Sequence, residues 1–239
     1  MSYKLKMLIE NLNKVEENIQ KSCRKSGRNR SEIKLIAVSK THSVEEIEDV
    51  IKAGVYDFGE NKAQELSAKF PKINNPVNWH FIGHLQTNKV KYIIDSAEYI
   101  HSVDSTKLAD EINKRAKSIN KIKKVLLEIN TSDEESKFGL TKEIDIIEVA
   151  EFCRDCENIL LVGLMTMAPY TDEKKIIRDC FIKLRNLKDS LNQKGFSLKE
   201  LSMGMTNDYE IAIEEGATMI RVGTAIFGER DYSKSWKEI

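Results

Sequence analysis

Lys34-Leu-Ile-Ala-Val-Ser-Lys40 is the stretch from which the fold can be derived. Its apolar run, residues 35–38, is typical of a strand buried on both faces of a parallel sheet. The segment that follows, Ser43-Val-Glu-Glu46, contains the serine and the glutamate of a capping box, so a helix begins almost at once. Lys40 is therefore predicted at the carboxyl end of a strand in a βα unit, where α/β proteins place their chemistry.

A lysine at this position has two interpretations. Because lysine side chains are seldom buried, the ordinary interpretation of Lys40 is a solvated amine at a strand end. The alternative is a Schiff-base lysine, whose amine, desolvated in a pocket, loses its proton readily and condenses with a carbonyl. The choice depends on which other residues reach the same end of the sheet.

The alternation of strand and helix continues along the chain. After the first strand, further strands are predicted within residues 55–61, 78–83, 99–103, 125–129, 160–166, 201–206 and 219–228, with helices between them. Eight strands within about 200 residues meet the requirement for a closed (β/α)₈ barrel of the TIM type. An open doubly wound sheet is the alternative, but such a sheet normally has a glycine-rich turn after its first strand, and none follows Lys40.

The N-terminal segment has the pattern of a long amphipathic helix. Leu5, Leu8, Leu12, Val15 and Ile19 recur at spacings of three and four residues, as on one face of a helix. This extra helix, within residues 1–30, is expected to pack on the barrel. The 239 residues suffice for one barrel or two small domains, and no Pro-, Gly- or Ser-rich linker divides them. We predict a single domain, residues 1–239.

Composition limits the classes of partner. Lys plus Arg and Asp plus Glu both number 38, so no strong field attracts nucleic acid or a membrane surface. The sequence contains neither a secretory signal nor an apolar run long enough to span a bilayer, so a cytoplasmic protein with small-molecule ligands is expected. Cys153-Arg-Asp-Cys156 has the spacing of a redox or metal motif, but no second pair completes it, and we interpret these cysteines as inert helix thiols. No metal site is predicted, since the four histidines are scattered.

In a barrel, all strand carboxyl ends meet on one face, so residues distant in sequence become neighbours there. Residues predicted at or near such ends are Lys40, Asn61, His80, Met165, Ser202 and Arg221. Loops after strands seven and eight commonly bind phosphate, and here they are Ser202-Met-Gly-Met-Thr206 and Arg221-Val-Gly-Thr224. Glycine lets backbone amides approach an anion, and a helix N-terminus favours its charge. A phosphate site opposite an imine-forming lysine suits pyridoxal phosphate, or an aldose phosphate in a Schiff-base aldolase.

Longer motifs decide between these ligands. The strings AVSKTHSVEEI, DFGENKAQE, WHFIGHLQTNK, SKFGL, GLMTMAP, LSMGMTNDYEIAI and RVGTAIFGERDY resemble, in order and spacing, the pyridoxal phosphate homeostasis proteins of the YggS/PROSC family. The match runs from about Ile33 to Tyr232. The resemblance implies a barrel like the N-terminal domain of bacterial alanine racemase, with pyridoxal 5′-phosphate bound as a lysine imine.

The resemblance also implies roles for particular residues. Lys40 would form the imine and Arg221 would be the partner of the pyridine nitrogen. The implied phosphate ligands are Ser202, Gly223 and Thr224, and Asn61 and His80 would line the pocket. Thr206 stands where the LSMGM motif leads us to expect serine, and it keeps a hydroxyl.

The implied role is intracellular pyridoxal phosphate homeostasis and amino-acid balance without established catalysis, with apoenzymes that accept the cofactor as candidate partners. The alternative is a pyridoxal phosphate-dependent amino-acid racemase. Alanine-racemase-like enzymes carry a second, β-rich domain that supplies a tyrosine base from the partner subunit. This chain ends about a dozen residues after its eighth predicted strand, with Tyr232 the only tyrosine in that tail. The expectation is therefore a monomer that is not an enzyme.

Overall fold

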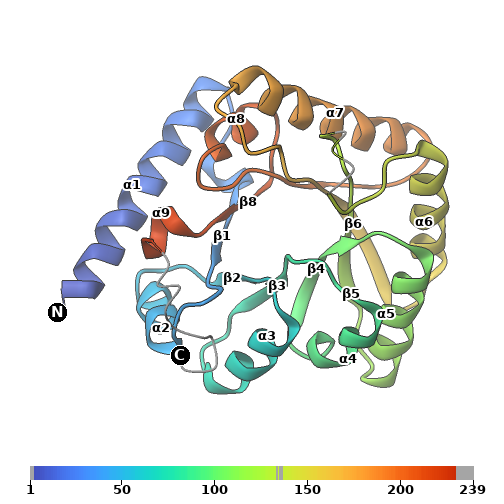
Figure 1. The fold of residues 1–239 in the computed structure, drawn as a ribbon, viewed down its shortest axis with the longest axis horizontal. Coiled ribbons are helices and arrows are strands. Elements are labelled where there is room, and N and C mark those ends of the chain that lie inside the picture. Colours follow the sequence, from blue (N-terminus) through green and yellow to red (C-terminus); the bar gives the residue numbers. More distant parts are fainter. Residues whose placement is uncertain (1–2, 133, 135–136, 230–239) are drawn as a thin grey trace.

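The computed structural model describes residues 3–132, 134 and 137–229. Eight parallel strands close into a barrel in the order β1-β2-β3-β4-β5-β6-β7-β8, which confirms the predicted (β/α)₈ fold (Figure 1). Ser136 and Tyr232, which belong to the motifs quoted above, lie outside the described residues. The strands are β1 Lys34–Val38, β2 Asp57–Glu60, β3 Asn78–Phe81, β4 Ala97–Val103, β5 Lys123–Glu128, β6 Ile159–Met165, β7 Glu200–Ser202 and β8 Met219–Val222.

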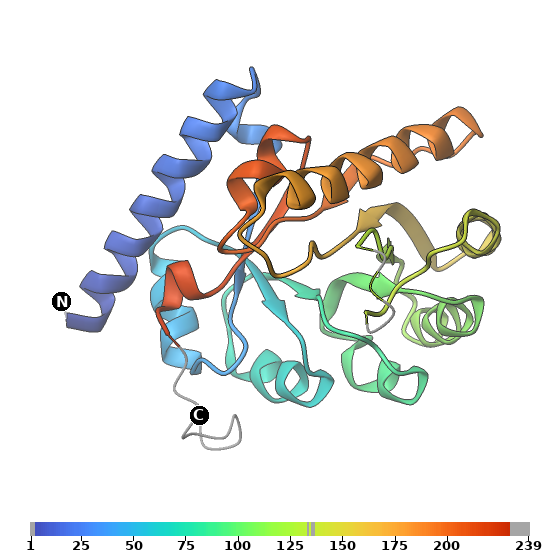
Figure 2. The same ribbon diagram turned by 45° about the horizontal axis from the view of Figure 1, so that its top comes forward.

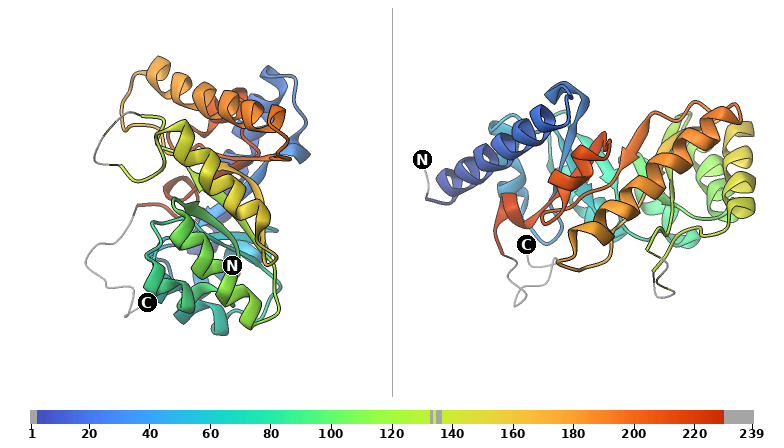
Figure 3. Two further views of the ribbon diagram at one scale, coloured as in Figure 1. Left: turned by 90° about the vertical axis from the view of Figure 1, so that its right-hand side faces the viewer. Right: turned by 90° about the horizontal axis from the view of Figure 1, so that it is seen from above.

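Helices surround the barrel, as the alternating pattern predicts. Ser43 caps α2 through the expected capping box, accepting a hydrogen bond from the amide of Glu46 at 3.3 Å. Figure 3 shows the two longest helices, α1 and α7, on the outside of the barrel. The α-helices are α1 Tyr3–Lys25, α2 Val44–Lys52, α3 Ala63–Lys69, α4 Val90–Ile93, α5 Thr106–Ser118, α6 Glu143–Asp155, α7 Lys174–Gln193, α8 Tyr209–Glu214 and α9 Thr224–Phe227.

Helix α1 is the extra N-terminal helix, and it runs along the side of the barrel near α8 and α9 (Figure 2). Its apolar stripe is buried except for Leu5, which is half-buried, and two of its asparagines bond to these helices. Asn11 Nδ2 donates to the carbonyl oxygen of Ile226 at 3.0 Å, and Asn18 Nδ2 donates to the hydroxyl of Tyr209 at 3.2 Å. Helix α1 therefore fixes two elements that follow β7 and β8.

The barrel interior has an apolar part and a polar part. Alternate side chains of each strand point inward, and the apolar part is formed by Ile36, Leu126, Met165 and Met219. The polar part consists of buried side chains, namely His80, His101, Ser202 and Arg221. Below, the end of the barrel at the strand C-termini is called the mouth, and the end at the strand N-termini is called the floor.

The structure also bears on membrane spans, on the cysteines and on metal sites. No helix within the described residues is at once long and apolar enough to cross a membrane. Cys153 is fully buried in α6, and this burial raises the pKa of its thiol to about 12, so the thiol stays protonated and unreactive at neutral pH. In the part of the chain that the structure describes, no cluster of His, Cys, Asp and Glu could hold a metal ion.

Candidate functional site

The loop that carries Lys40 is fixed on both sides of this residue. The Ser39 hydroxyl donates to Glu60 Oε1 at 2.7 Å, and the Thr41 amide donates to Glu65 Oε1 at 2.6 Å. Thr41 has a φ of 67°, which is uncommon for a β-branched residue and needs support from its surroundings. These bonds to its two neighbours set the position of Lys40, which is half-buried at the mouth, just beyond β1.

A buried cation lies between the two glutamates. The Lys69 ammonium donates to Glu60 Oε1 at 2.8 Å, to Glu65 Oε1 at 2.7 Å and to the carbonyl oxygen of Ser39 at 2.8 Å. Burial raises the pKa of Glu60 to about 7, although the charge of Lys69 opposes this shift. An unpaired buried charge is costly, so Lys69 is needed where it is. Its amine is committed to three acceptors, which makes it a structural lysine beside the candidate reactive one.

Helix α9 and the residue before it lie directly beside the Lys40 loop. Because β1 and β8 pair in parallel, Gly223 comes next to the end of β1, and a Cβ there would lie 3.4 Å from the carbonyl oxygen of Val38. The ring of His42 stacks on Phe227 of α9, with a centroid separation of 4.4 Å. The structure thus brings together the ends of the first and last strands, from which Lys40 and Gly223 were proposed as ligands.

The loop after β7 reaches the same place. Gly204 has a φ of 93°, and a Cβ at this position would lie 2.6 Å from Cβ of Ala212, so glycine is required. Two residues later, Thr206 Oγ1 accepts from the amide of Ala225 at 3.5 Å. Thr206 therefore places its hydroxyl at the first turn of α9, which begins at Thr224. The sequence pattern drew attention to Thr206 only as a departure from serine.

Arg221 is buried inside the barrel near the mouth. Its Nη1 donates to the carbonyl oxygen and the hydroxyl of Ser202, at 2.8 and 2.6 Å, and its Nη2 donates to the carbonyl oxygen of Thr166 at 2.9 Å. Burial lowers the pKa of the guanidinium to about 10, although Asp208 and Glu128 act to raise it, so the group remains charged. Among the described residues these three bonds use three of its five N–H groups, so the Nε–H and one Nη2–H are donors that a ligand could accept from.

Ser202 and His80 lie inside the barrel, with partners of their own. The Ser202 hydroxyl is 2.9 Å from His101 Nδ1, and His101 Nε2 is 2.9 Å from His80 Nδ1. The other nitrogen of His80 is 2.9 Å from Asp57 Oδ1, and the ring stacks on Tyr99 at a centroid separation of 4.5 Å. The roles of Ser202 in phosphate binding and of His80 in lining the pocket stay predictions.

Asn61 lies at the mouth, just after β2, and is half-buried. A Cβ at Gly83, which follows β3, would lie 2.3 Å from the carbonyl oxygen of Asn61, so glycine is needed for the two loops to approach this closely. Its contact with a cofactor also stays a prediction. Met165, the remaining residue predicted near a strand end, is the last residue of β6 as expected, and it belongs to the apolar part of the interior.

Glu128, at the end of β5, is a buried carboxyl group that the sequence analysis did not single out. It alternates with Leu126 and so points into the barrel, and it is only 3% exposed. Burial raises its pKa to about 7, Asp104 acts in the same direction, and Arg221 opposes both. Within the described residues its Oε2 has no hydrogen-bond partner. The signal in the sequence that could have indicated Glu128 is a glutamate directly after the apolar residues 125–127 of a predicted strand.

The amino-acid sequence of this chain is similar to a family model and to several named proteins. Residues 11–231 match the family model of the alanine racemase N-terminal domain. The pyridoxal phosphate homeostasis protein of Aquifex aeolicus is 44% identical over 225 residues, which cover 93% of this chain and 98% of that protein. The mouse protein of the same name is 39% identical over 238 residues, covering 93% of this chain and 87% of that one.

Solved structures are similar to the whole barrel. PipY of Synechococcus elongatus, in a structure with pyridoxal phosphate bound, superposes with a TM-score of 0.80 at 31% identity, covering 92% of this chain and 100% of PipY. An alanine racemase of Clostridium difficile superposes with a TM-score of 0.76 at 19% identity. That likeness covers 94% of this chain and 57% of the racemase, and it concerns the fold alone.

Proposed function

Because this chain belongs to the pyridoxal phosphate homeostasis proteins, within the alanine racemase N-terminal domain family, we propose that it binds pyridoxal 5′-phosphate through Lys40. In this proposal the protein holds and releases the cofactor inside the cell, with apoenzymes that need the cofactor as its recipients. The observation that carries the proposal is the position of the loop that contains Lys40, which is fixed after β1 and lies beside Gly223 and α9.

The residues at the mouth fit the chemical groups of this cofactor. An aldehyde needs an amine, which Lys40 supplies. A phosphate needs hydrogen-bond donors, and the hydroxyls of Thr206 and Thr224 and the backbone at Gly223 lie at or beside the first turn of α9. A pyridine nitrogen needs a donor, and the Nε–H of Arg221 is one that cannot be deprotonated at neutral pH. No metal ligand is required by any of these contacts.

The phosphate contacts can be tested by comparing two ligands. Thr224→Val should weaken the binding of pyridoxal phosphate by at least about tenfold, because one lost hydrogen bond to a charged group costs about 1.5–3 kcal/mol. The same variant should bind pyridoxal, which lacks the phosphate, as the wild type does. Titration followed by absorbance measures both dissociation constants. Equal affinity of the wild-type protein for the two ligands would contradict the phosphate site and weaken the proposed function.

We further propose that the protein is not an amino-acid racemase. Bound pyridoxal phosphate supplies an electron-withdrawing ring, whose pull on an amino-acid α-carbon is strongest when the ring nitrogen is protonated. A guanidinium only donates hydrogen bonds, so Arg221 would keep that nitrogen unprotonated and the pull weak. Lys40 would then have to transfer protons without this assistance.

We expect no sustained racemisation of amino acids. General acid–base assistance is typically worth about 10²–10⁴-fold, so lacking one of two bases should leave α-proton exchange slower by that factor than in a racemase. The measurement is incubation of cofactor-loaded protein with L-alanine in D₂O, followed by mass spectrometry for deuterium and chiral chromatography for the D-isomer. Multiple turnovers that disappear in Lys40→Ala would favour the racemase alternative instead.

A further inference from the structure

A continuous series of buried hydrogen bonds crosses the barrel from its floor to Arg221. At the floor, Asp57 Oδ1 contacts Lys34 Nζ at 3.2 Å and His80 Nε2 at 2.9 Å. The series continues inward from His80 to His101 and to Ser202, each step 2.9 Å long, and ends with Arg221 Nη1, 2.6 Å from the Ser202 hydroxyl. The two histidines and Ser202 are fully buried, and Arg221 nearly so.

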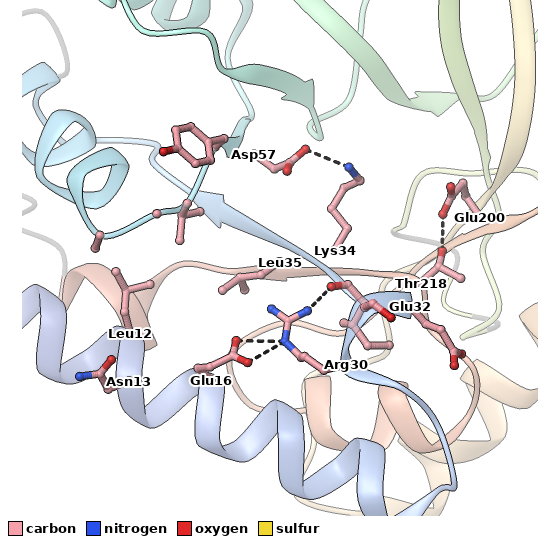
Figure 4. A pocket seen from close by; sticks show the side chains of 16 residues that line it. Leu12, Asn13, Glu16, Arg30, Glu32, Lys34, Leu35, Asp57, Glu200 and Thr218 are labelled. Carbon is pink, nitrogen blue, oxygen red and sulfur yellow. Dashed lines mark hydrogen bonds and ion pairs between the residues drawn. The ribbon is translucent and has the colours of Figure 1, made fainter.

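The floor end of this series opens into a cavity of about 550 Å³ between α1 and the starts of β1, β2 and β7. Figure 4 shows the Lys34 amine directed at Asp57 on one side of it, with Arg30 paired to Glu16 of α1 on the other. Glu200 lines the same cavity. Asp57 is therefore within reach of solvent, whereas the rest of the series is not.

The direction of every hydrogen bond can be derived from the floor end. Burial alone would raise the pKa of Asp57, but the hydrogen bond from His80 and the charge of Lys34 lower it, so Asp57 is a carboxylate and only accepts. His80 must then donate through Nε2. Burial lowers the pKa of His80, and lowers that of His101 further with the help of His80 and Arg221, so both rings are neutral.

A neutral imidazole has one donor and one acceptor nitrogen. Since His80 Nε2 donates, its Nδ1 accepts from His101 Nε2, and His101 Nδ1 accepts from the hydroxyl of Ser202. The oxygen of Ser202 is then left to accept from Arg221. The other end is compatible with this order, because a guanidinium only donates and the Ser202 oxygen can accept from it while its hydrogen is donated to His101. Asp57 at the floor end therefore sets a single direction for four consecutive bonds.

We propose that Asp57, His80, His101 and Ser202 are positioning residues that hold Arg221 in one orientation at the mouth, so that the floor carboxylate controls how Arg221 meets the cofactor. This inference rests on the proposed function for the identity of the cofactor. In it, Ser202 acts on the cofactor through Arg221, because its hydroxyl hydrogen is used by His101. Without the Asp57 carboxylate, His80 would no longer have to donate through Nε2, and the hydrogen bonds of the series could run in either direction.

The histidine tautomers test the series without any cofactor. In ¹⁵N spectra of histidine-labelled apoprotein, both His80 and His101 should be neutral rings with the hydrogen on Nε2, assigned with His80→Gln and His101→Gln variants. A hydrogen on Nδ1 of either ring would overturn the proposal. This result does not depend on whether pyridoxal phosphate is the ligand, so it separates failure of the series from failure of the proposed function.

Asp57→Asn tests the link to the cofactor. An amide both donates and accepts, so it no longer forces His80 to donate, and we expect cofactor affinity to fall by about tenfold, as for other supporting partners of a ligand residue, with a shift in the absorbance of the bound cofactor. Asp95→Asn is the matched control. Asp95 pairs with Lys121 at 2.7 Å, whereas the partners of the two histidines within the described residues are Asp57, Ser202 and each other, so Asp95→Asn should behave as the wild type does.

Combining two variants shows whether the effect travels through Ser202. In a Ser202→Ala background the series is interrupted, so Asp57→Asn should change affinity and absorbance no further. Equal effects of Asp57→Asn with and without Ser202, or wild-type affinity and absorbance in Asp57→Asn, would overturn the proposal. Circular dichroism and thermal unfolding of each variant establish that the comparison is made on folded protein.

Discussion

A Lys40→Ala variant should no longer retain pyridoxal phosphate as a borohydride-reducible adduct, whereas the wild-type protein should carry one adduct on the peptide that contains Lys40. The physical reason is the chemistry of the amine: reduction fixes only a cofactor that is covalently attached through a lysine nitrogen. Lys69 also bonds to the loop that carries Lys40, but its amine is committed to three acceptors. The adduct should therefore be lost, with no transfer to a neighbouring lysine.

Peptide mapping by mass spectrometry after reduction is the measurement, with absorbance as a parallel record. Lys62→Ala is a matched control, because Lys62 is exposed and directly follows Asn61 at the mouth. It should keep the adduct at full stoichiometry. A single adduct at another lysine in the Lys40→Ala protein would show that the assignment to Lys40 is wrong.

The largest expected effect on stability comes from Lys69→Met. Removing this cation leaves Glu60 and Glu65 buried without their partner, and breaking a buried ion pair in this way typically costs about 3–5 kcal/mol. The free energy of unfolding, measured in urea, should fall by that amount at pH 8. Because the same side chain supports Ser39, cofactor binding through Lys40 should weaken as well.

The pH dependence of this effect has a definite sign. Glu60 has a pKa of about 7 in the folded protein and about 4.3 in an unfolded chain, so its ionisation destabilises the fold as the pH rises from about 4.3 through 7. The cost of Lys69→Met should therefore be smaller at pH 5 than at pH 8, since a protonated Glu60 needs no cation. Lys72→Met, an exposed lysine in the next turn, should change the free energy of unfolding by less than about 0.5 kcal/mol. An equal cost for both variants would contradict the buried cluster.

The fold, and the meeting of the candidate site residues at one end of it, could be predicted from the sequence because the signals are local. The apolar run before Lys40 and the capping box after it are short-range signals, and repetition of the same pattern leads to the closed barrel. Strand ends must then meet at the mouth, which is why Lys40 and Gly223 could be placed together before their contacts were known.

The supporting side chains could not be predicted, because their contacts are long-range. Glu65 and Lys69 are four residues apart on α3 and would ordinarily be taken as a solvated helix pair. Only the tertiary structure shows that they are buried against the loop of Lys40. Likewise, His101 and Ser202 are separated by 101 residues, and neither residue type indicates a hydrogen bond across a barrel.

The packing of α1 against α9 has a consequence for the folding of the chain during its synthesis on the ribosome. Asn11 and Ile226, which join these helices, are 215 residues apart, and at roughly 5–20 residues per second the ribosome needs about 10–40 s to go from one to the other. During that interval α1 lacks the contacts that it makes with α9 in the finished protein. Helix α9 follows Gly223, so a nascent chain completes this side of the barrel mouth only when α1 meets α9. Under the proposed function, a chain that has not yet reached α9 would lack the proposed phosphate site.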